Sequence, residues 1–165
     1  MSKTQWYIGI PNGVVLCIND VEQHHWEAEF FHAYSETGVR VANIEELISG
    51  LARFYNGLNF PYPGTNIRSF TMNKDDQIQY KERKRVMQDD ELLSKHGDLG
   101  TFIIRVQHRQ NSSWQGRLTW MDQDKTVYFR SIWEMMQLIE SALDKVMEPE
   151  KRAPLPVWPE DGEKE

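Results

Sequence analysis

Residues 101–143 read TFIIRVQHRQNSSWQGRLTWMDQDKTVYFRSIWEMMQLIESAL, and this stretch decides the fold. Its first part contains three β-prone runs of alternating apolar and polar residues, separated by turn-forming residues, as in three half-buried strands. From Ser131 onward the apolar residues recur at helical spacing, and Glu134 follows Ser131 at the distance typical of a capped helix start. The stretch therefore predicts a β-β-β-α module.

A fainter copy of this module lies 88 residues upstream. Without a gap, Trp26 aligns with Trp114, and Asn43 aligns with the capping Ser131. Identities are few, but the order of turns, the apolar pattern and the helix start agree, and these features specify a fold. The alternative is two unrelated segments, each a strand meander followed by a helix.

The two modules predict one compact α+β domain over residues 1–147, with a first module at 1–63 and a second at 101–147. One module alone has a single apolar sheet face and a single apolar helix stripe, which is too little for a stable fold. We therefore expect the duplicated β-β-β-α module to form a joined antiparallel sheet. Its helices should pack on one face, with pseudo-two-fold symmetry.

Within the first module, Pro11-Asn12-Gly13 separates the apolar runs 5–10 and 14–18. Asn-Gly between two β-prone runs predicts a hairpin, because both central residues of such a turn need positive φ. A helix is expected from residue 44 to about 57, before the prolines that follow. A strand is expected over 26–34, with these side chains on one face: Trp26, Ala28, Phe30 and His32.

Two further segments lie outside the modules. Residues 64–100 are rich in charge and predict a linker that carries a strand at 67–72 and a short helix at about 89–95. Residues 148–165 are proline-rich and acidic, so we expect them to be disordered, with Trp158 as a possible partner contact.

The composition narrows the classes of function. A net charge of −6 and a pI near 5.4 give no general attraction to nucleic acid or to anionic membranes. There is no apolar run of membrane-spanning length and no signal-peptide pattern, so we expect a cytoplasmic protein. Cys17, the single cysteine, lies in an apolar run and is expected to be an inert core thiol.

Arginines in the second module form the candidate ligand site. On strands, Arg105 and Arg109 would point away from the apolar residues between them, and Arg130 would point away from its buried neighbours. Together with Asn111 and Ser113 they suit a phosphate or carboxylate ligand. Equally, exposed arginines in an acidic chain form surface ion pairs, and that alternative stays open.

The run RQNSSWQG followed by FRSIWE resembles an uncharacterised family of short bacterial, clostridial-type proteins with the pattern R-Q-N-x-S-W-Q-G…F-R-S-x-x-E. The resemblance covers residues 101–143. It implies that Gln115 belongs with the ligand residues and that Trp114 is a core or partner-contact residue. It implies no known activity.

A weaker resemblance is to PilZ domains, which bind cyclic di-GMP through R-x-x-x-R and [D/N]-x-S-x-x-G. Arg105 and Arg109 match the first motif, and residues 111–116 match the second. In PilZ domains a strand-length segment separates the two motifs, whereas here only Gln110 does. The helical pattern and the repeat also depart from a PilZ barrel.

Signals for an enzyme are missing from the sequence. It contains no nucleophile elbow, phosphate loop, dinucleotide fingerprint or zincin motif. His25 and His32 have opposite parity on an extended segment, so they do not predict a metal site. We expect no catalysis, no cofactor and no metal.

Two functions remain. The first is a non-enzymatic module that binds a protein partner, with a homo-oligomer as one option. The second is a sensor of a small anion or nucleotide that uses the arginine patch. Nucleic-acid binding ranks below both because of the net charge.

Overall fold

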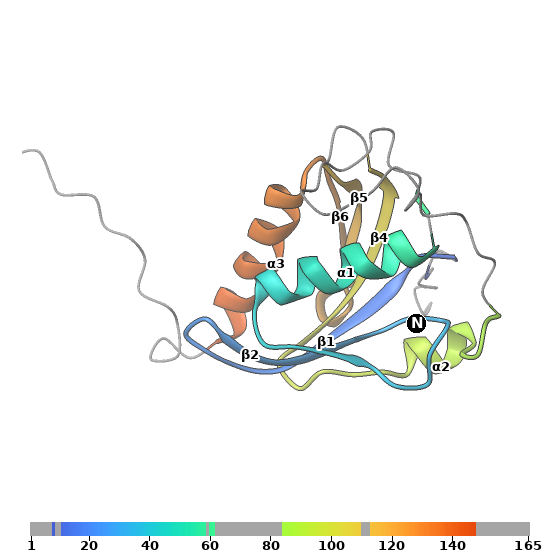
Figure 1. Ribbon diagram of the computed structural model, residues 1–165. Coiled ribbons are helices and arrows are strands. Elements are labelled where there is room, and N and C mark those ends of the chain that lie inside the picture. Colours follow the sequence, from blue (N-terminus) through green and yellow to red (C-terminus); the bar gives the residue numbers. More distant parts are fainter. Residues whose placement is uncertain (1–7, 9–10, 59, 62–83, 110–112, 148–165) are drawn as a thin grey trace, which may run out of the picture.

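The computed structural model describes residues 8, 11–58, 60–61, 84–109 and 113–147. These residues form six strands and three α-helices (Figure 1). In chain order they are β1 (Val14–Glu22), β2 (His25–Phe31), β3 (Val39–Val41), α1 (Ile44–Leu58), α2 (Asp89–Leu93), β4 (Gly100–His108), β5 (Gln115–Trp120), β6 (Lys125–Phe129) and α3 (Ile132–Val146). A 3₁₀ turn, η1 (Met121–Gln123), joins β5 to β6.

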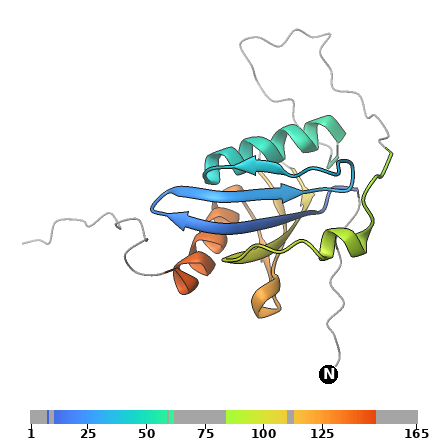
Figure 2. The same cartoon turned by 90° about the horizontal axis from the view of Figure 1, so that it is seen from below.

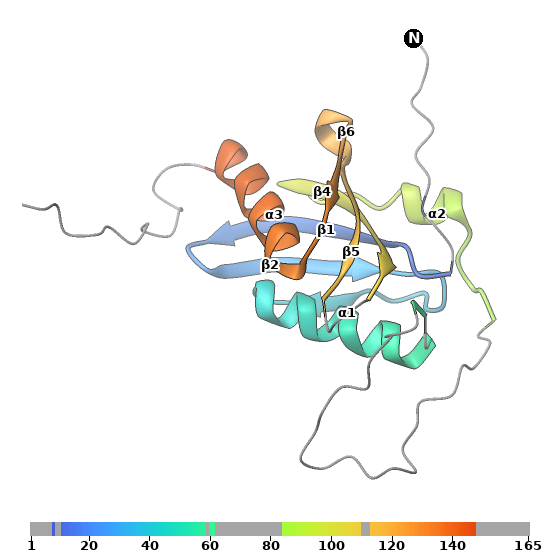
Figure 3. The same cartoon turned by 90° about the horizontal axis from the view of Figure 1, so that it is seen from above.

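All six strands form one antiparallel sheet in the order β3-β2-β1-β4-β5-β6. Its centre is the β1–β4 pair, in which Val15 faces Ile103. The sheet is strongly twisted, so that β5 and β6 cross the direction of β1 and β2 steeply (Figure 3). The expected α+β fold with an antiparallel sheet is confirmed.

One face of the sheet, called here the inner face, packs against α1 and α3. Every strand contributes buried side chains to this core, because strand residues alternate between faces. The helices contribute the stripe that recurs at three- and four-residue spacing, which includes Leu47 and Leu51 on α1 and Met135 and Ile139 on α3. These four side chains are fully buried, so both helices share one core.

The opposite face, called here the outer face, packs against α2 over part of its area. A small apolar cluster there joins Val15, Cys17 and Ile103 to Met87 and to Leu92 of α2. Figure 2 shows α1 and α2 on opposite sides of β1 and β2. The short helix expected near 89–95 is therefore present, and it packs on the face that the two long helices leave uncovered.

Both long helices begin with the side-chain caps that the sequence predicts. The Asn43 Oδ1 accepts a hydrogen bond from the Glu46 amide (2.8 Å), and the Glu46 carboxylate accepts one from the Ala42 amide (2.7 Å). In α3 the Ser131 hydroxyl accepts from the Glu134 amide (3.1 Å). Each cap satisfies amides that the first helical turn leaves unpaired.

The hairpin expected at Pro11–Gly13 is wrong. β1 pairs with β2 on one side and with β4 on the other, so Val15–Ile18 has no edge left for a hairpin partner. The expected partner run 5–10, apart from Ile8, lies outside the described residues. Asn12 is instead buried, and its amide donates to the Val106 carbonyl of β4. The strand expected at 67–72 and the tail at 148–165 lie outside the described residues.

No helix among the described residues is long and apolar enough to cross a membrane.

Candidate functional site

The described members of the expected ligand set do not gather in one patch. A register shift between Val106 and His108 changes the face to which the end of β4 points. Arg105 stays on the outer face, whereas Arg109 contacts α1 on the inner side. The expectation that these two arginines share one face is therefore wrong, and Asn111 lies outside the described residues.

Arg109 is a buried guanidinium held against the last turn of α1. It is 4% exposed, its Nε donates to the Pro61 carbonyl and its Nη1 donates to the Asn56 Oδ1, both at 2.7 Å. Its guanidinium carbon lies 5.7 Å from the centre of the Tyr55 ring. Because α1 has no basic residue in its last turn, Arg109 supplies the positive charge that a helix C-terminus favours.

Burial sets the electrostatics of this contact. It lowers the pKa of the Arg109 guanidinium and raises the pKa of the Tyr55 phenol. Trp114 packs edge-on against Tyr55, with ring centres 5.4 Å apart. No described carboxylate forms a salt bridge with Arg109, so neutral oxygens and an aromatic face hold this cation in place.

Most of the other described residues of the RQNxSWQG…FRSxxE signature have structural roles. Arg130 forms an exposed salt bridge with Glu134 (3.2 Å) at the start of α3. Trp114 and Phe129 are core residues, and Gln115 is half-buried. A Cβ on Gly116 would come within 1.9 Å of the Arg105 carbonyl oxygen, so no side chain fits there.

A different set of residues stands out on the outer face. Arg105 of β4 faces Arg117 of β5, and Arg117 faces Tyr128 of β6. All three alternate with residues of the inner core, so they form one row across the outer face that ends at the edge of the sheet. Arg117 is exposed and Tyr128 is 48% exposed. We call Arg105, Arg117 and Tyr128 the outer row.

The next row on the same strands is polar as well. Thr119 and Thr126 face each other, and their hydroxyls are 2.9 Å apart in a hydrogen bond. The outer face thus changes character along the sheet. It is apolar and covered by α2 where β1 and β4 meet, and it is polar and basic on β5 and β6.

Sequence reasoning missed Arg117 and Tyr128 because it followed the arginines nearest the signature motif. The signal was available: Arg117 is flanked by Gly116 and Leu118, both on the inner face. Strict alternation along β5 and β6 places Arg117 and Tyr128 on the same side as Arg105.

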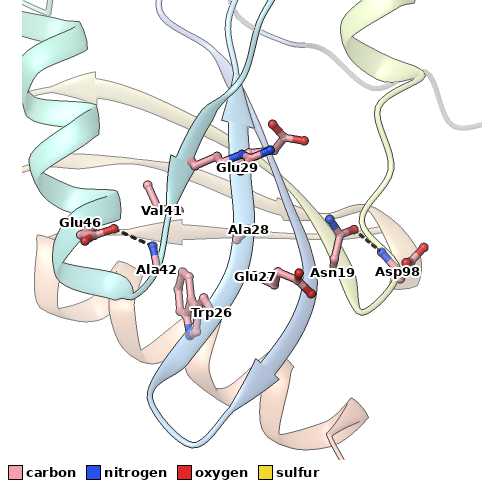
Figure 4. A pocket seen from close by; sticks show the side chains of 10 residues that line it. Asn19, Trp26, Glu27, Ala28, Glu29, Val41, Ala42, Glu46 and Asp98 are labelled. Atoms are coloured by element: carbon pink, nitrogen blue, oxygen red, sulfur yellow. Dashed lines mark hydrogen bonds between the residues drawn. The ribbon is translucent and has the colours of Figure 1, made fainter.

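A hollow of about 530 Å³ lies elsewhere, at the other end of the sheet. Trp26 and Val41 lie toward the start of α1, and Glu27, Asn19 and Asp98 lie on the opposite side of the hollow (Figure 4). Glu46 on its wall is already engaged in the helix cap. Among the described residues, no three His, Cys, Asp or Glu side chains are placed to share a metal ion.

The single thiol is not placed for nucleophilic chemistry. Cys17 is 2% exposed, and burial, together with the nearby Glu29 carboxylate, raises its pKa to about 12. A thiol with so high a pKa holds its proton at neutral pH and is a poor nucleophile.

Comparison of the chain with protein-family models, with curated proteins and with solved structures finds no match in any of the three.

Proposed function

We propose that this chain is a non-enzymatic cytosolic interaction module that binds another protein through the outer face of β5 and β6. The observation that carries the proposal is the outer row. On the outer face, Val15 and Cys17 of the first half lie in the apolar cluster that includes Leu92 of α2. The second half instead exposes Arg117 and Tyr128, residue types that are enriched in protein interfaces.

The edge strand β6 adds to this surface. Four of its five residues are exposed, and Val127 and Tyr128 expose 45% and 48% of their surface on opposite sides of the strand. An edge strand carries backbone amides and carbonyls that a partner can pair with. A binding role therefore requires no enclosed cavity and no catalytic group.

We also propose that the fold arose by duplication of a β-β-β-α module and has pseudo-two-fold symmetry. Pairings recur with an offset of 88 residues: Val15 with Phe31 corresponds to Ile103 with Thr119. The central pair Val15 and Ile103 joins two equivalent positions.

Two further correspondences support the duplication. The irregularity between Ile18 and Asp20 in β1 recurs between Val106 and His108 in β4. The bounds of α1 at 44–58 and of α3 at 132–146 also differ by 88 at both ends. Two unrelated meanders would have no reason to share a bulge position.

The alternative, a sensor of a small anion or nucleotide, has less support. Arg109 and Arg130 already have structural partners, and the outer row retains only Arg105 from the expected ligand set. The relation to the short bacterial family is likewise a proposal, and the structural roles of Trp114, Gly116, Phe129 and Ser131 fit a signature that specifies the fold.

The test places a photo-crosslinking amino acid at position 128 in the full chain. In extracts of the host we expect a crosslinked adduct of the size expected for a protein partner. Added untagged wild-type protein should compete for this partner and reduce the adduct, whereas added Arg117→Glu protein should not. A crosslinker at exposed Arg53 on α1 serves as the control. Equal adducts from both positions, or none from position 128, would contradict the proposed surface.

A further inference from the structure

We infer that the partner of this surface is an extended acidic segment that adds to β6 as a seventh strand. The inference rests on the proposed function and names the chemistry of the partner. It follows from the position of β6 at the edge of the sheet, from the charged residues of β5 and β6, and from the position of Arg117 and Tyr128 outside both hollows.

β6 is the less protected of the two edges of the sheet. It lies last in the strand order, and its pairing with β5 runs through five consecutive residue pairs without a bulge. Natural edge strands are commonly protected by charge, proline, bulges or short length. The other edge, β3, has three residues with Arg40 at its centre, whereas the centre of β6 is the uncharged run Thr126–Tyr128.

The charged residues of β5 and β6 themselves, Arg117 and Lys125, favour an anionic partner. Arg105 lies directly opposite Arg117 in the sheet and belongs to the same row of the outer face. Arg117 forms no salt bridge with any described residue, and neither β5 nor β6 contains Asp or Glu. An acidic side chain from outside would give Arg117 a bidentate partner.

The surface suits a strand better than a compact ligand. Neither of the two hollows described for the molecule is lined by Arg117 or Tyr128. A strand added to β6 would lie about 10 Å from β5, since neighbouring strands are about 4.8 Å apart. A glutamate on its outer side would pass beside the Tyr128 ring, and the glutamate and arginine side chains together span that distance. Main-chain hydrogen bonds to β6 would supply the affinity, and the alternating carboxylates of the partner would supply the specificity.

The test measures binding of labelled peptides to the full chain by fluorescence anisotropy. The probe is an alternating Glu-Val peptide of about eight residues, with an alternating Lys-Val peptide of the same length as the control. We expect the acidic peptide to bind, its affinity to fall as salt rises, and the basic peptide not to bind. Arg117→Glu should weaken binding at least about tenfold, whereas Arg53→Glu, the same charge change on α1, should leave it unchanged.

Strand addition has its own control in the probe. An acidic peptide with N-methyl groups on alternate amides keeps its charge. It loses the hydrogen-bond donors of one edge and keeps those of the other edge. We expect methylation on the edge that faces β6 to abolish binding and methylation on the other edge to preserve it. Undiminished binding of both methylated peptides would overturn the added strand.

Other occupants of the edge would also overturn the inference. Binding of an oligouridylate more tightly than the acidic peptide would assign the outer row to nucleic acid. Dimerisation of the pure protein that Arg117→Glu abolishes would assign β6 to a second copy of the chain. Failure of the acidic peptide while position 128 still crosslinks a protein would reject the acidic segment and leave the proposed function standing. Failure of both would reject both.

Discussion

Arg109 shows how a charged residue in a motif can serve the fold. Its guanidinium joins the end of β4 to the last turn of α1 and to the Pro61 carbonyl, so it connects the two halves of the chain. Truncation would leave the Asn56 and Pro61 oxygens without their donor inside the protein. A hydrogen bond that involves a charged group contributes about 1.5–3 kcal/mol, and leaving a buried acceptor unpaired adds to the loss.

We therefore expect Arg109→Ala to lower the free energy of unfolding by about 2–4 kcal/mol, measured by urea denaturation. Arg117→Ala is the matched control: it removes an exposed arginine and should change stability by less than about 0.5 kcal/mol. Similar losses from the two substitutions would show that the contacts of Arg109 are not what stabilises the end of α1.

Cys17 gives a second prediction at the residue scale. With its pKa raised to about 12 from an unperturbed value near 9, the native thiol has about a thousandfold less thiolate at neutral pH. We expect a chromogenic disulfide reagent to react with the native protein at least about a hundredfold more slowly than with the urea-unfolded chain. Fast labelling of the native protein would mean that β1 opens or that the thiol is accessible.

The same thiol predicts a change of stability with pH. A raised pKa means that the folded state holds this proton more tightly than the unfolded chain does. The free energy of unfolding should therefore fall as pH rises from about 9 toward 12, because the unfolded thiol ionises first. The slope should be smaller in Cys17→Ala than in the wild-type protein, and equal slopes would contradict this origin.

At the scale of elements, the side-chain caps of α1 and α3 determine where these two helices begin. Asn43→Ala and Ser131→Ala should each lower the free energy of unfolding by about 1 kcal/mol, since each removes the acceptor for a first-turn amide. Ser141→Ala removes a hydroxyl from the exposed middle of α3 and is the control, with an expected change below about 0.5 kcal/mol. Denaturation of the three variants under identical conditions tests this, and an equal effect of Ser141→Ala would contradict it.

The antiparallel sheet and the elements with local signals were predictable, whereas two details that depend on distant pairing were not. The caps at Asn43 and Ser131 and the apolar stripes of both helices are readable within a few residues. The hairpin at Pro11–Gly13 failed because β4, from the far side of the linker, occupies the edge of β1 that it needed. The arginine patch failed because one bulge near the end of β4 moved Arg109 to the inner face, and a bulge has no dependable signature in a single sequence.

For the whole molecule, the decisive feature is that both halves contribute to one core. Leu51 of α1 and Ile139 of α3 are both fully buried in the cluster that also contains inner-face residues of every strand. The central pairing of β1 with β4 joins the halves through backbone hydrogen bonds as well. A chain built this way should unfold as one unit, although its modules look separable in sequence.

We therefore expect one calorimetric transition, and we expect Leu51→Ala and Ile139→Ala each to shift that same transition. Each substitution removes a fully buried side chain and should cost about 2–5 kcal/mol. The sharper measurement is native-state hydrogen exchange. Leu51→Ala, in the first half, should speed exchange of the slowest amides of β4 as well as those of β1, because only global unfolding exposes either set. The control is Val146→Ala, near the end of α3, where the side chain is 40% exposed. It should not change the exchange rates of the slowest amides of β1 or β4 appreciably. If Leu51→Ala accelerated only β1 and β2, the two halves would open independently, and the shared core would not make them one cooperative unit.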